Sequence, residues 1–514
     1  MYPGTYAAQF PDKPAVILAG DGAVLSYREL DQGSTRLARC LHQRGLRRGD
    51  HIALLTDNYP TAFEVYWAAL RSGLYITVVN WHLSASEISY IVGDCGAKAL
   101  NVSARLSEVA ERIVPDTPEV RIRLSYQSKV PGYEMYEDTL ADVSAEPLPE
   151  QPYGMDMLYS SGTTGRPKGI ERALPEREIT DEPKPGEGSM AIFGILYGFG
   201  LDTVYLSPGP VYHAAPLRFC GLTHTTGGTV VMMERFDAEA ALAAIERYHV
   251  THSQWVPTMF VRMLKLDSPV RDRYDLSSLR VAIHAAAPCP VDVKRAMIDW
   301  WGPVLQEYYS STEGNGVTVI DSEQWLRKPG SVGRAGLGMI RICDSLGTEL
   351  APGEVGTVYF ERDEPPFYYH NDDAKTAEAR HPRHPNWTTT GDVGYVDSDG
   401  FLFLTDRKAF MIISGGVNIY PQEIENALAL HPKVYDVAVI GVPDPEMGES
   451  VLAVVQPAAE VSAGAGLAEE LQAYLRERIG HYKVPRKFDF TDELPRTPTG
   501  KLVKGKLRER YLAS

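Results

Sequence analysis

Cysteine is scarce in this sequence. Its 514 residues include five cysteines, and none of them forms a Cys-x-x-Cys pair with another. A disulfide framework or a structural zinc site is built from cysteines at close, regular spacings, so the sequence favours neither. Reduced thiols in a cytosol fit the pattern better, and we predict a cytoplasmic protein.

Long hydrophobic runs and basic blocks are missing as well. No uninterrupted apolar run reaches the roughly 18 residues of a membrane-crossing helix, and the N-terminus lacks the basic stretch and apolar core of a signal peptide. We therefore expect neither a membrane-spanning segment nor export. Lys and Arg number 51 against 67 Asp and Glu, which gives a net charge of −16 without any Lys/Arg-rich block. Binding to nucleic acid is not expected, because phosphate backbones attract basic surfaces.

The length of the chain exceeds what one hydrophobic core usually holds, so two or more domains are expected. The first 150 residues alternate helical and extended patterns, which is typical of an α/β fold. The predicted elements are helices at 35–44 and 60–71, strands at 51–55, 75–79 and 97–102, and a capping box of Ser84 and Glu87 that opens a further helix. The alternation returns in a predicted helix at 236–248 and predicted strands at 253–256 and 279–284.

After about residue 330 the pattern changes to shorter β segments with turn signals, such as Asp399-Gly400, a predicted hairpin. We expect a small β subdomain there. A polar stretch at 175–188 is interpreted as a surface insertion or lid. From residue 407 onward a compact α+β pattern follows, with predicted helices at 421–430 and 467–479 and predicted strands at 434–442 and 450–456.

The segment 160–169 concentrates hydroxyls, glycines and one cation, Lys168. Glycines let the backbone curl until successive N–H groups converge on an anion, and Lys168 supplies a point charge. An ordinary P-loop is disfavoured, because Lys168 lies between Pro167 and Gly169 rather than between Gly and Ser or Thr. A flexible loop is the alternative for this segment alone. The predicted phosphate-binding residues are Ser160, Ser161, Gly162, Thr163, Thr164, Gly165 and Lys168.

Four further motifs follow in order: Tyr309-Ser310-Ser311-Thr312-Glu313, Thr390-Gly391-Asp392, Asp406-Arg407 and Pro498-Thr499-Gly500-Lys501. Together with segment 160–169 they resemble the motifs of the adenylate-forming superfamily of acyl-CoA synthetases, standalone adenylation domains and beetle luciferases. The resemblance covers nearly the whole chain. It implies an AMP-forming acid:CoA ligase that uses ATP, Mg²⁺ and coenzyme A.

The resemblance also completes the predicted fold class. We expect an α/β protein with a large N-terminal domain of α/β subdomains plus a small β subdomain at 1–405. A hinge at 406–409 and a small mobile α+β C-terminal domain at 410–514 follow. In the family, the small domain rotates over the large one, which makes most of the substrate contacts.

The resemblance does not determine the acyl acceptor or the acid substrate. Acyl-AMP ligases and standalone adenylation enzymes that load carrier proteins share the nucleotide motifs, and a nucleotide-binding relative without turnover is a further alternative. A fatty acid is the first substrate that we expect, with alicyclic, steroid side-chain and aromatic acids as others. The expected partners are therefore a small carboxylic acid, ATP and CoA. A homodimer is one assembly that the sequence leaves open.

Activation of a carboxylate by ATP requires sites for adenine, ribose, metal and two anions that repel each other. Tyr309 offers a flat ring for stacking on adenine, with a plain core tyrosine as the alternative. Glu313 offers the hard carboxylate oxygen that Mg²⁺ prefers. The resemblance implies that Thr312 contacts the phosphate and that Glu313 binds the magnesium.

Asp392 can accept two hydrogen bonds from vicinal ribose hydroxyls, with a turn aspartate as the alternative. Arg407, at the predicted domain junction, could donate to the same ribose, and the resemblance implies ribose binding by both residues. It also places the backbone of Ala286, Ala287 and Pro288 beside adenine and the acyl pocket. Core packing would explain these small residues equally well.

Lys501 could bridge the attacking carboxylate and the α-phosphate in the transition state, with a solvated C-terminal lysine as the alternative. His213 matches a histidine that in relatives lies beside the acyl and thiol site. Gly415 and Gly416 match a segment that swings in for the second half-reaction, although glycines there could be only a turn. The catalytic residues that the resemblance implies are Lys501, Thr312, Glu313 and His213.

Two places depart from the family's pattern. Ala409 and Phe410 occupy hinge positions that are commonly charged, and Phe410 could pack between the domains. Ser310 stands where relatives usually have Gly, a change that need not disturb Tyr309.

Overall fold

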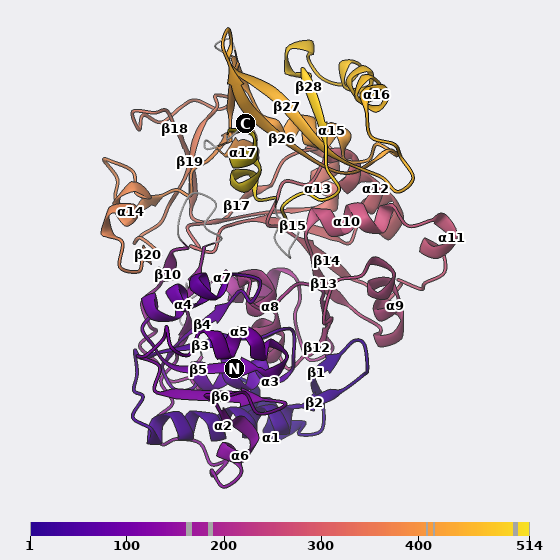
Figure 1. The fold of residues 1–514 in the computed structure, drawn as a ribbon. Coiled ribbons are helices and arrows are strands. Elements are labelled where there is room, and N and C mark those ends of the chain that lie inside the picture. The colour runs from indigo at the N-terminus through magenta and orange to yellow at the C-terminus, as the bar shows by residue number, and fades with distance from the viewer. Residues whose placement is uncertain are drawn as a thin grey trace.

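Figure 1 shows the computed structural model, which describes residues 2–160, 167–182, 189–407, 410–414, 417–496 and 502–512. The N-terminal half, drawn from indigo to magenta, forms the lower part of the molecule. The C-terminal residues, drawn in yellow, lie at the top. The predicted mixed α/β architecture with a large N-terminal part and a small C-terminal part is confirmed.

The first sheet is parallel, with the strand order β7-β6-β5-β3-β4-β8 in the described part of the chain. Alternate residues of its central strands enter two separate hydrophobic cores, so both faces are covered and the strands are apolar throughout. Its strands are β3 (His51–Leu55), β4 (Tyr75–Val79), β5 (Ala97–Ser103), β6 (Ile122–Tyr126), β7 (Glu134–Met135) and β8 (Met155–Asp156). The helices of this region are α1 (Pro3–Gln9), α2 (Tyr27–Gln43), α3 (Thr61–Leu70), α4 (Ala85–Asp94), α5 (Ser107–Arg112) and α6 (Tyr136–Leu140).

The second sheet has the order β17-β16-β15-β14-β13-β11-β12-β1-β2 and is parallel in its centre, from β15 to β1. Its strands are β1 (Pro14–Leu18), β2 (Val24–Ser26), β11 (Val204–Ser207), β12 (Thr229–Met232), β13 (His252–Trp255), β14 (Val281–His284), β15 (Leu305–Tyr309), β16 (Val317–Asp321) and β17 (Arg334–Leu337). The helices are α7 (Ser189–Leu196), α8 (Ala214–Thr225), α9 (Ala238–Tyr248), α10 (Pro257–Leu264), α11 (Ser268–Arg271), α12 (Val291–Trp301) and α13 (Ser322–Arg327).

Shorter antiparallel strands follow residue 337, as the change of pattern predicted. The hairpin at Asp399-Gly400 is confirmed, because it joins two antiparallel strands. The strands of this sheet are β18 (Met339–Cys343), β19 (Gly356–Glu361), β21 (Trp387–Thr388), β22 (Asp392–Val396) and β23 (Leu402–Arg407). A separate small sheet contains β9 (Leu158–Tyr159), β10 (Gly169–Glu171) and β20 (Tyr368–Tyr369), and helix α14 (Asp373–Glu378) follows it.

The C-terminal part has the predicted α+β pattern, with its own hydrophobic core. Each predicted helix and strand is present with ends that differ by three residues or fewer. The strands are β24 (Ile412–Ser414), β25 (Val417–Ile419), β26 (Val434–Asp444), β27 (Gly448–Pro457) and β28 (Lys487–Phe490). The helices are α15 (Pro421–Leu428), α16 (Ala465–Arg476) and α17 (Lys504–Leu512).

One helix differs from the sequence-based expectation. Helix α2 begins at Tyr27 rather than at residue 35, because Ser26 and Glu29 form a capping box that the prediction missed. The interpretation of the polar stretch at 175–188 as a surface insertion or lid stays a prediction, and its described part is hydrogen-bonded to the preceding chain. The backbone N–H of Ile179 donates to Gln151, and the Ile179 side chain is buried.

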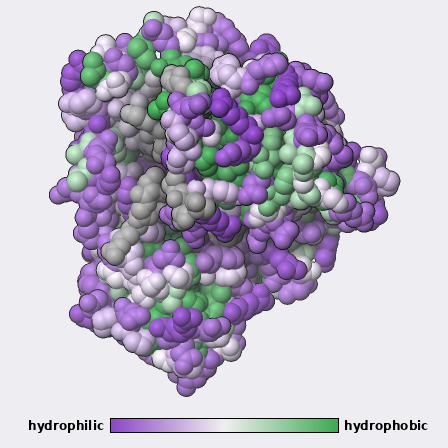
Figure 2. Space-filling model, turned by 45° about the horizontal axis from the view of Figure 1, so that its top comes forward, coloured by the Kyte–Doolittle hydropathy of each residue, from purple (hydrophilic) through white to green (hydrophobic). Residues whose placement is uncertain are grey.

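Figure 2 shows a face of the molecule that is mostly hydrophilic, with hydrophobic residues in several separate groups. Within the described ranges, no helix combines the length and the apolar character that crossing a membrane would need.

Candidate functional site

A cleft of about 1410 Å³ lies between the large and the small part of the molecule. Side chains from both α/β sheets, from the small β subdomain and from the C-terminal part line it. Every predicted site residue whose side chain the structure describes borders this one cleft. These residues are Ser160, Lys168, His213, Ala286, Ala287, Pro288, Tyr309, Thr312, Glu313 and Asp392.

The predicted phosphate-binding segment joins β9 to β10, two antiparallel strands. The backbone N–H of Ser160 donates to the carbonyl of Lys168 over 2.9 Å, and the N–H of Lys168 donates to the Ser160 Oγ over 3.2 Å. These bonds hold the two ends of the segment together, as a loop that wraps an anion requires. The other predicted phosphate-binding residues, Ser161, Gly162, Thr163, Thr164 and Gly165, lie outside the described residues.

The carboxylate of Glu313 is oriented by a tyrosine that the sequence analysis did not single out. The Tyr369 hydroxyl donates to Glu313 Oε1 over 2.9 Å, and both side chains are buried in the cleft wall. The Lys168 ammonium lies 5.2 Å from the centre of the Tyr369 ring. Two segments far apart in the sequence, β20 and the turn after β15, therefore fix a carboxylate close to Lys168, at the end of the predicted phosphate-binding segment.

Asp392 and Tyr309 are joined directly. The Tyr309 hydroxyl donates to Asp392 Oδ2 over 2.7 Å, and the Thr390 hydroxyl donates to the same oxygen over 2.9 Å. Asp392 is also the β-ladder partner of Arg407 on the neighbouring strand. The two predicted ribose-binding positions thus lie side by side in the backbone, while the Arg407 side chain lies outside what the structure describes.

Ala286 has a strained backbone. Its φ of 76° lies in the left-handed region, which costs a residue with a Cβ about 1–3 kcal/mol. The residue follows β14, and the strained turn brings Ala286, Ala287 and Pro288 to the cleft wall. Strain of this kind persists where the surroundings hold it, and it occurs often at functional sites.

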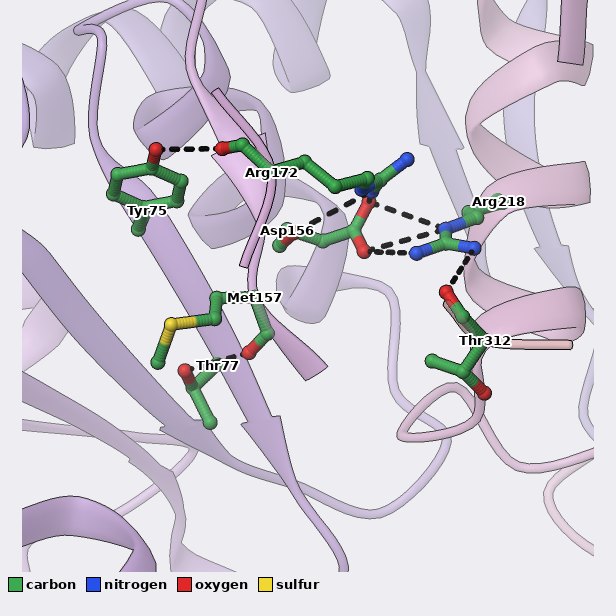
Figure 3. A network of polar contacts seen from close by, with 7 residues as sticks. All are labelled: Tyr75, Thr77, Asp156, Met157, Arg172, Arg218 and Thr312. Atoms are coloured by element: carbon green, nitrogen blue, oxygen red, sulfur yellow. Dashed lines mark hydrogen bonds and ion pairs between the residues drawn. The ribbon is translucent and has the colours of Figure 1, made fainter. Parts of the chain in front are cut away.

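His213 is the N-cap residue of α8, and its ring lies 4.6 Å from the ring of Tyr212. The same helix presents Arg218 to the cleft one and a half turns later. Figure 3 shows that Arg218 and Arg172 approach the carboxylate of Asp156 from two sides. The sequence analysis missed all three charged residues, because they belong to no motif and come from separate elements.

The chain next to Lys501 borders the cleft, whereas the described strands next to Gly415 and Gly416 do not. Lys501, Gly415 and Gly416 lie outside the described residues, as does Ala409. Directly after Lys501, residues 502–506 border the cleft. None of the described residues of β24 and β25, which flank the two glycines, borders it. Phe410 borders the cleft as well, near the Lys504 ammonium at 5.6 Å from its ring centre.

Known proteins resemble the chain over almost its whole length. The family model "AMP-binding enzyme" matches residues 5–364, and "AMP-binding enzyme C-terminal domain" matches residues 423–501. A feruloyl-CoA synthase from Amycolatopsis sp is 34% identical over 499 residues, which cover 95% of this chain and 94% of that protein. The fatty acid–[acyl-carrier-protein] ligase ScoC of Streptomyces coeruleorubidus is 31% identical, with 98% and 95% covered. The crystal structure of ATP-bound MatB from Rhodopseudomonas palustris is 27% identical, with a TM-score of 0.82 and 99% of each chain covered.

Proposed function

The chain belongs to the AMP-binding enzyme family, and from this premise we propose that it is an AMP-forming acid:CoA ligase. In the first half-reaction a carboxylate attacks the α-phosphate of ATP, which gives an acyl-adenylate and pyrophosphate. In the second, the thiol of CoA attacks the adenylate, which gives acyl-CoA and AMP. The observation that supports the proposal best is the convergence of the described candidate residues on one cleft.

The nucleotide would lie across the two sheets that form the large part of the molecule. Tyr309 would stack on adenine, the strained turn at Ala286 would bring the backbone close to it, and Asp392 would accept from the ribose hydroxyls. The hydrogen bond from Tyr309 to Asp392 would couple the proposed adenine and ribose positions. Arg407 and the loop after Ser160 are proposed to hold the ribose and the phosphates.

Glu313 is the proposed magnesium ligand. Its carboxylate borders the cleft, and Tyr369 donates to only one of its oxygens, which fits a cation that prefers one or two carboxylates plus phosphate oxygens. Bound Mg²⁺ would neutralise phosphate charge. Thr312 would donate to the phosphate, and Lys501 would stabilise the charge that builds up between the carboxylate and the α-phosphate.

The arrangement of the C-terminal part fits the first half-reaction. Residues that directly follow Lys501 border the cleft, whereas the strands around Gly415 and Gly416 do not. We infer that residues 406–409 act as a hinge about which the small domain turns, so that the glycine turn approaches His213 for thiol transfer. CoA is the proposed acceptor. A carrier protein is the second candidate, which the likeness to ScoC favours.

A fatty acid is the first proposed substrate. The cleft offers an apolar region beside α8, where Phe193, Phe219 and Tyr308 pack with ring centres 4.7–6.0 Å apart. Phe193, Phe219 and Tyr308 form an aromatic wall, which favours an aryl-substituted acid as the second candidate. The 34% identity to a feruloyl-CoA synthase favours the same candidate. A cytoplasmic location and a homodimer stay predictions.

The direct test is product identification. Purified protein would be incubated with ATP, Mg²⁺ and decanoate, palmitate, ferulate, indole-3-acetate or cyclohexanecarboxylate, with and without CoA, and the products would be analysed by mass spectrometry. We expect acyl-CoA and AMP with at least one acid. Adenylate that accumulates unchanged in the presence of CoA would favour the carrier-loading alternative. The absence of acid-dependent pyrophosphate release would favour a nucleotide-binding relative without turnover.

A further inference from the structure

Two guanidinium groups share one carboxylate in the wall of the cleft. Arg218 Nη2 lies 2.7 Å from Asp156 Oδ2, and Arg172 Nη2 lies 3.0 Å from Asp156 Oδ1. The exposed fractions of these side chains are 12% for Arg218, 20% for Arg172 and 7% for Asp156. Among the described residues, Asp156 is the only carboxylate that pairs with either arginine.

The charges of this cluster therefore do not balance. Burial alone would raise the pKa of Asp156, but the two guanidiniums outweigh burial and hold its pKa below the ordinary value, so the carboxylate is ionised. Burial also raises the pKa of the neighbouring phenols of Tyr66 and Tyr308, which stay neutral. The cluster has a net charge of +1 in a part of the protein where water is largely excluded, and an uncompensated buried charge is costly.

Only Arg218 of the three residues borders the cleft. Figure 3 shows its guanidinium between Asp156 and Thr312, whose carbonyl oxygen lies 3.5 Å from Arg218 Nη1. On the other side, the next residue of α8, Phe219, belongs to the aromatic wall with Phe193 and Tyr308. Arg218 thus lies where the proposed acyl region meets the proposed phosphate region.

We propose that Arg218, with the surplus charge of the Asp156–Arg172–Arg218 cluster, forms the subsite that attracts the carboxylate of the acid substrate. This inference rests on the proposed function. The acid must approach a triphosphate of the same sign, and a fixed cation at the border of the two regions lowers that repulsion before any bond forms. Asp156 holds the guanidinium in position, and Arg172 offsets the charge of Asp156, so that Arg218 keeps its attraction for an anion.

The first experiment compares an acid with its neutral amide. Binding of ferulate and ferulamide, and of decanoate and decanamide, would be measured by calorimetry on protein saturated with α,β-methylene-ATP. Arg218→Met is expected to weaken carboxylate binding about tenfold and to leave amide binding nearly unchanged, because a charge-assisted hydrogen bond is lost. Arg280→Met is the matched control, since Arg280 pairs with Asp202 at the surface and does not border the cleft.

The second experiment tests the charge count. Arg172→Met leaves Asp156 and Arg218 as a neutral pair, so the preference for carboxylate over amide should fall. The double variant Asp156→Asn/Arg172→Met restores a net charge of +1 and should restore the preference. A purely structural role of these residues predicts the opposite order, because the double variant removes more contacts than the single one.

Three outcomes would overturn the inference. Equal loss of acid and amide binding in Arg218→Met would make the residue structural, and a double variant that binds like Arg172→Met would remove the role of surplus charge. If Arg218→Met binds pyrophosphate more weakly than wild type but binds the acids equally well, Arg218 contacts the phosphates and not the acid. Wild-type protein that binds none of the five acids of the product assay would instead contradict the proposed function, which keeps the two failures distinct.

Discussion

At the scale of single residues, Tyr369 is the clearest addition to the candidate site. Its hydroxyl donates to Glu313, the proposed magnesium ligand. Tyr369→Phe should leave the fold intact and raise the Mg²⁺ concentration for half-maximal ATP–pyrophosphate exchange roughly fivefold to tenfold. Without the hydrogen bond from Tyr369, the metal itself must order the Glu313 carboxylate when it binds.

Tyr368→Phe is the control for this prediction. Tyr368 precedes Tyr369 on β20, and its hydroxyl donates to Glu171 instead of Glu313. Its Mg²⁺ dependence should match that of the wild type. An unchanged Mg²⁺ dependence in Tyr369→Phe would show that Glu313 needs no support from this hydroxyl.

A second residue-scale prediction concerns Lys501, whose proposed role is limited to the first half-reaction. Lys501→Ala should lower the rate of adenylate formation by at least about 100-fold, as expected for loss of a preorganised charge in the transition state. It should leave the conversion of synthetic acyl-adenylate to thioester within about twofold of wild type. Single-turnover assays of the two half-reactions would measure this, and equal loss in both would refute the assigned role.

At the scale of elements, a buried ion pair connects α12 to β15. Lys294 Nζ lies 2.5 Å from Glu307 Oε2, and His284 Nε2 lies 3.6 Å from the same oxygen. Burial lowers the pKa of His284 well below its ordinary value, so it does not replace the lysine as a cation. Lys294→Met should reduce the free energy of unfolding by about 3–5 kcal/mol at pH 8, since it leaves a buried carboxylate without a partner.

The loss in Lys294→Met should depend on pH. Burial raises the pKa of Glu307 even in the wild type, and without Lys294 the pKa would rise further. The folded variant then binds more protons than the unfolded chain, so its stability should recover as the pH falls from 8 to 5. Urea unfolding at both pH values would measure this, with Arg280→Met as the surface control. Equal losses at both pH values would contradict the prediction.

The hairpin of β24 and β25 gives the other prediction at this scale. Its described strands lie away from the cleft, and we propose that its turn enters the site only for thiol transfer. Gly416→Trp should therefore slow thioester formation at least about tenfold and leave adenylation nearly unchanged. Unimpaired thioester formation would remove this turn from the second half-reaction, and Ser414→Ala in the same hairpin is a mild control.

At the scale of the whole molecule, Lys265 connects the large part to the small one. Its ammonium donates to the carbonyls of Val434 and Tyr435, over 2.7 and 3.0 Å, at the start of β26. Burial lowers the pKa of Lys265, so the lysine is partly withdrawn from water when the two parts meet. These bonds exist only in an arrangement that places β26 beside α10.

Lys265→Met should therefore destabilise this arrangement. We expect the rate of adenylation to fall about tenfold, in line with the loss of hydrogen bonds from a charged donor. Conversion of preformed adenylate to thioester should not fall. Lys375→Met, which removes an exposed pair with Glu378 on α14, is the control. A parallel decrease in both half-reactions would mean that Lys265 serves stability alone.

The sequence by itself determined the local structure and the motif residues. Strands β3 and β4 have their predicted bounds, because buried parallel strands are short apolar runs with clear ends. The motif residues were predicted because five motifs in the right order resemble those of the adenylate-forming superfamily, and their residue types suit the roles that the resemblance implies. The start of α2 was missed although its capping box was present in the sequence.

Only the tertiary structure decided what lies beside the motif residues. The pairing of Asp156 with Arg172 and Arg218, and that of Tyr369 with Glu313, join elements that are remote along the chain. Nothing in local propensity or periodicity encodes such pairs, since they depend on the order of strands in the sheets and on how the sheets pack. The sequence thus determined which chemical groups are present, and the packing determined which of them lie together and where a buried charge is left unbalanced.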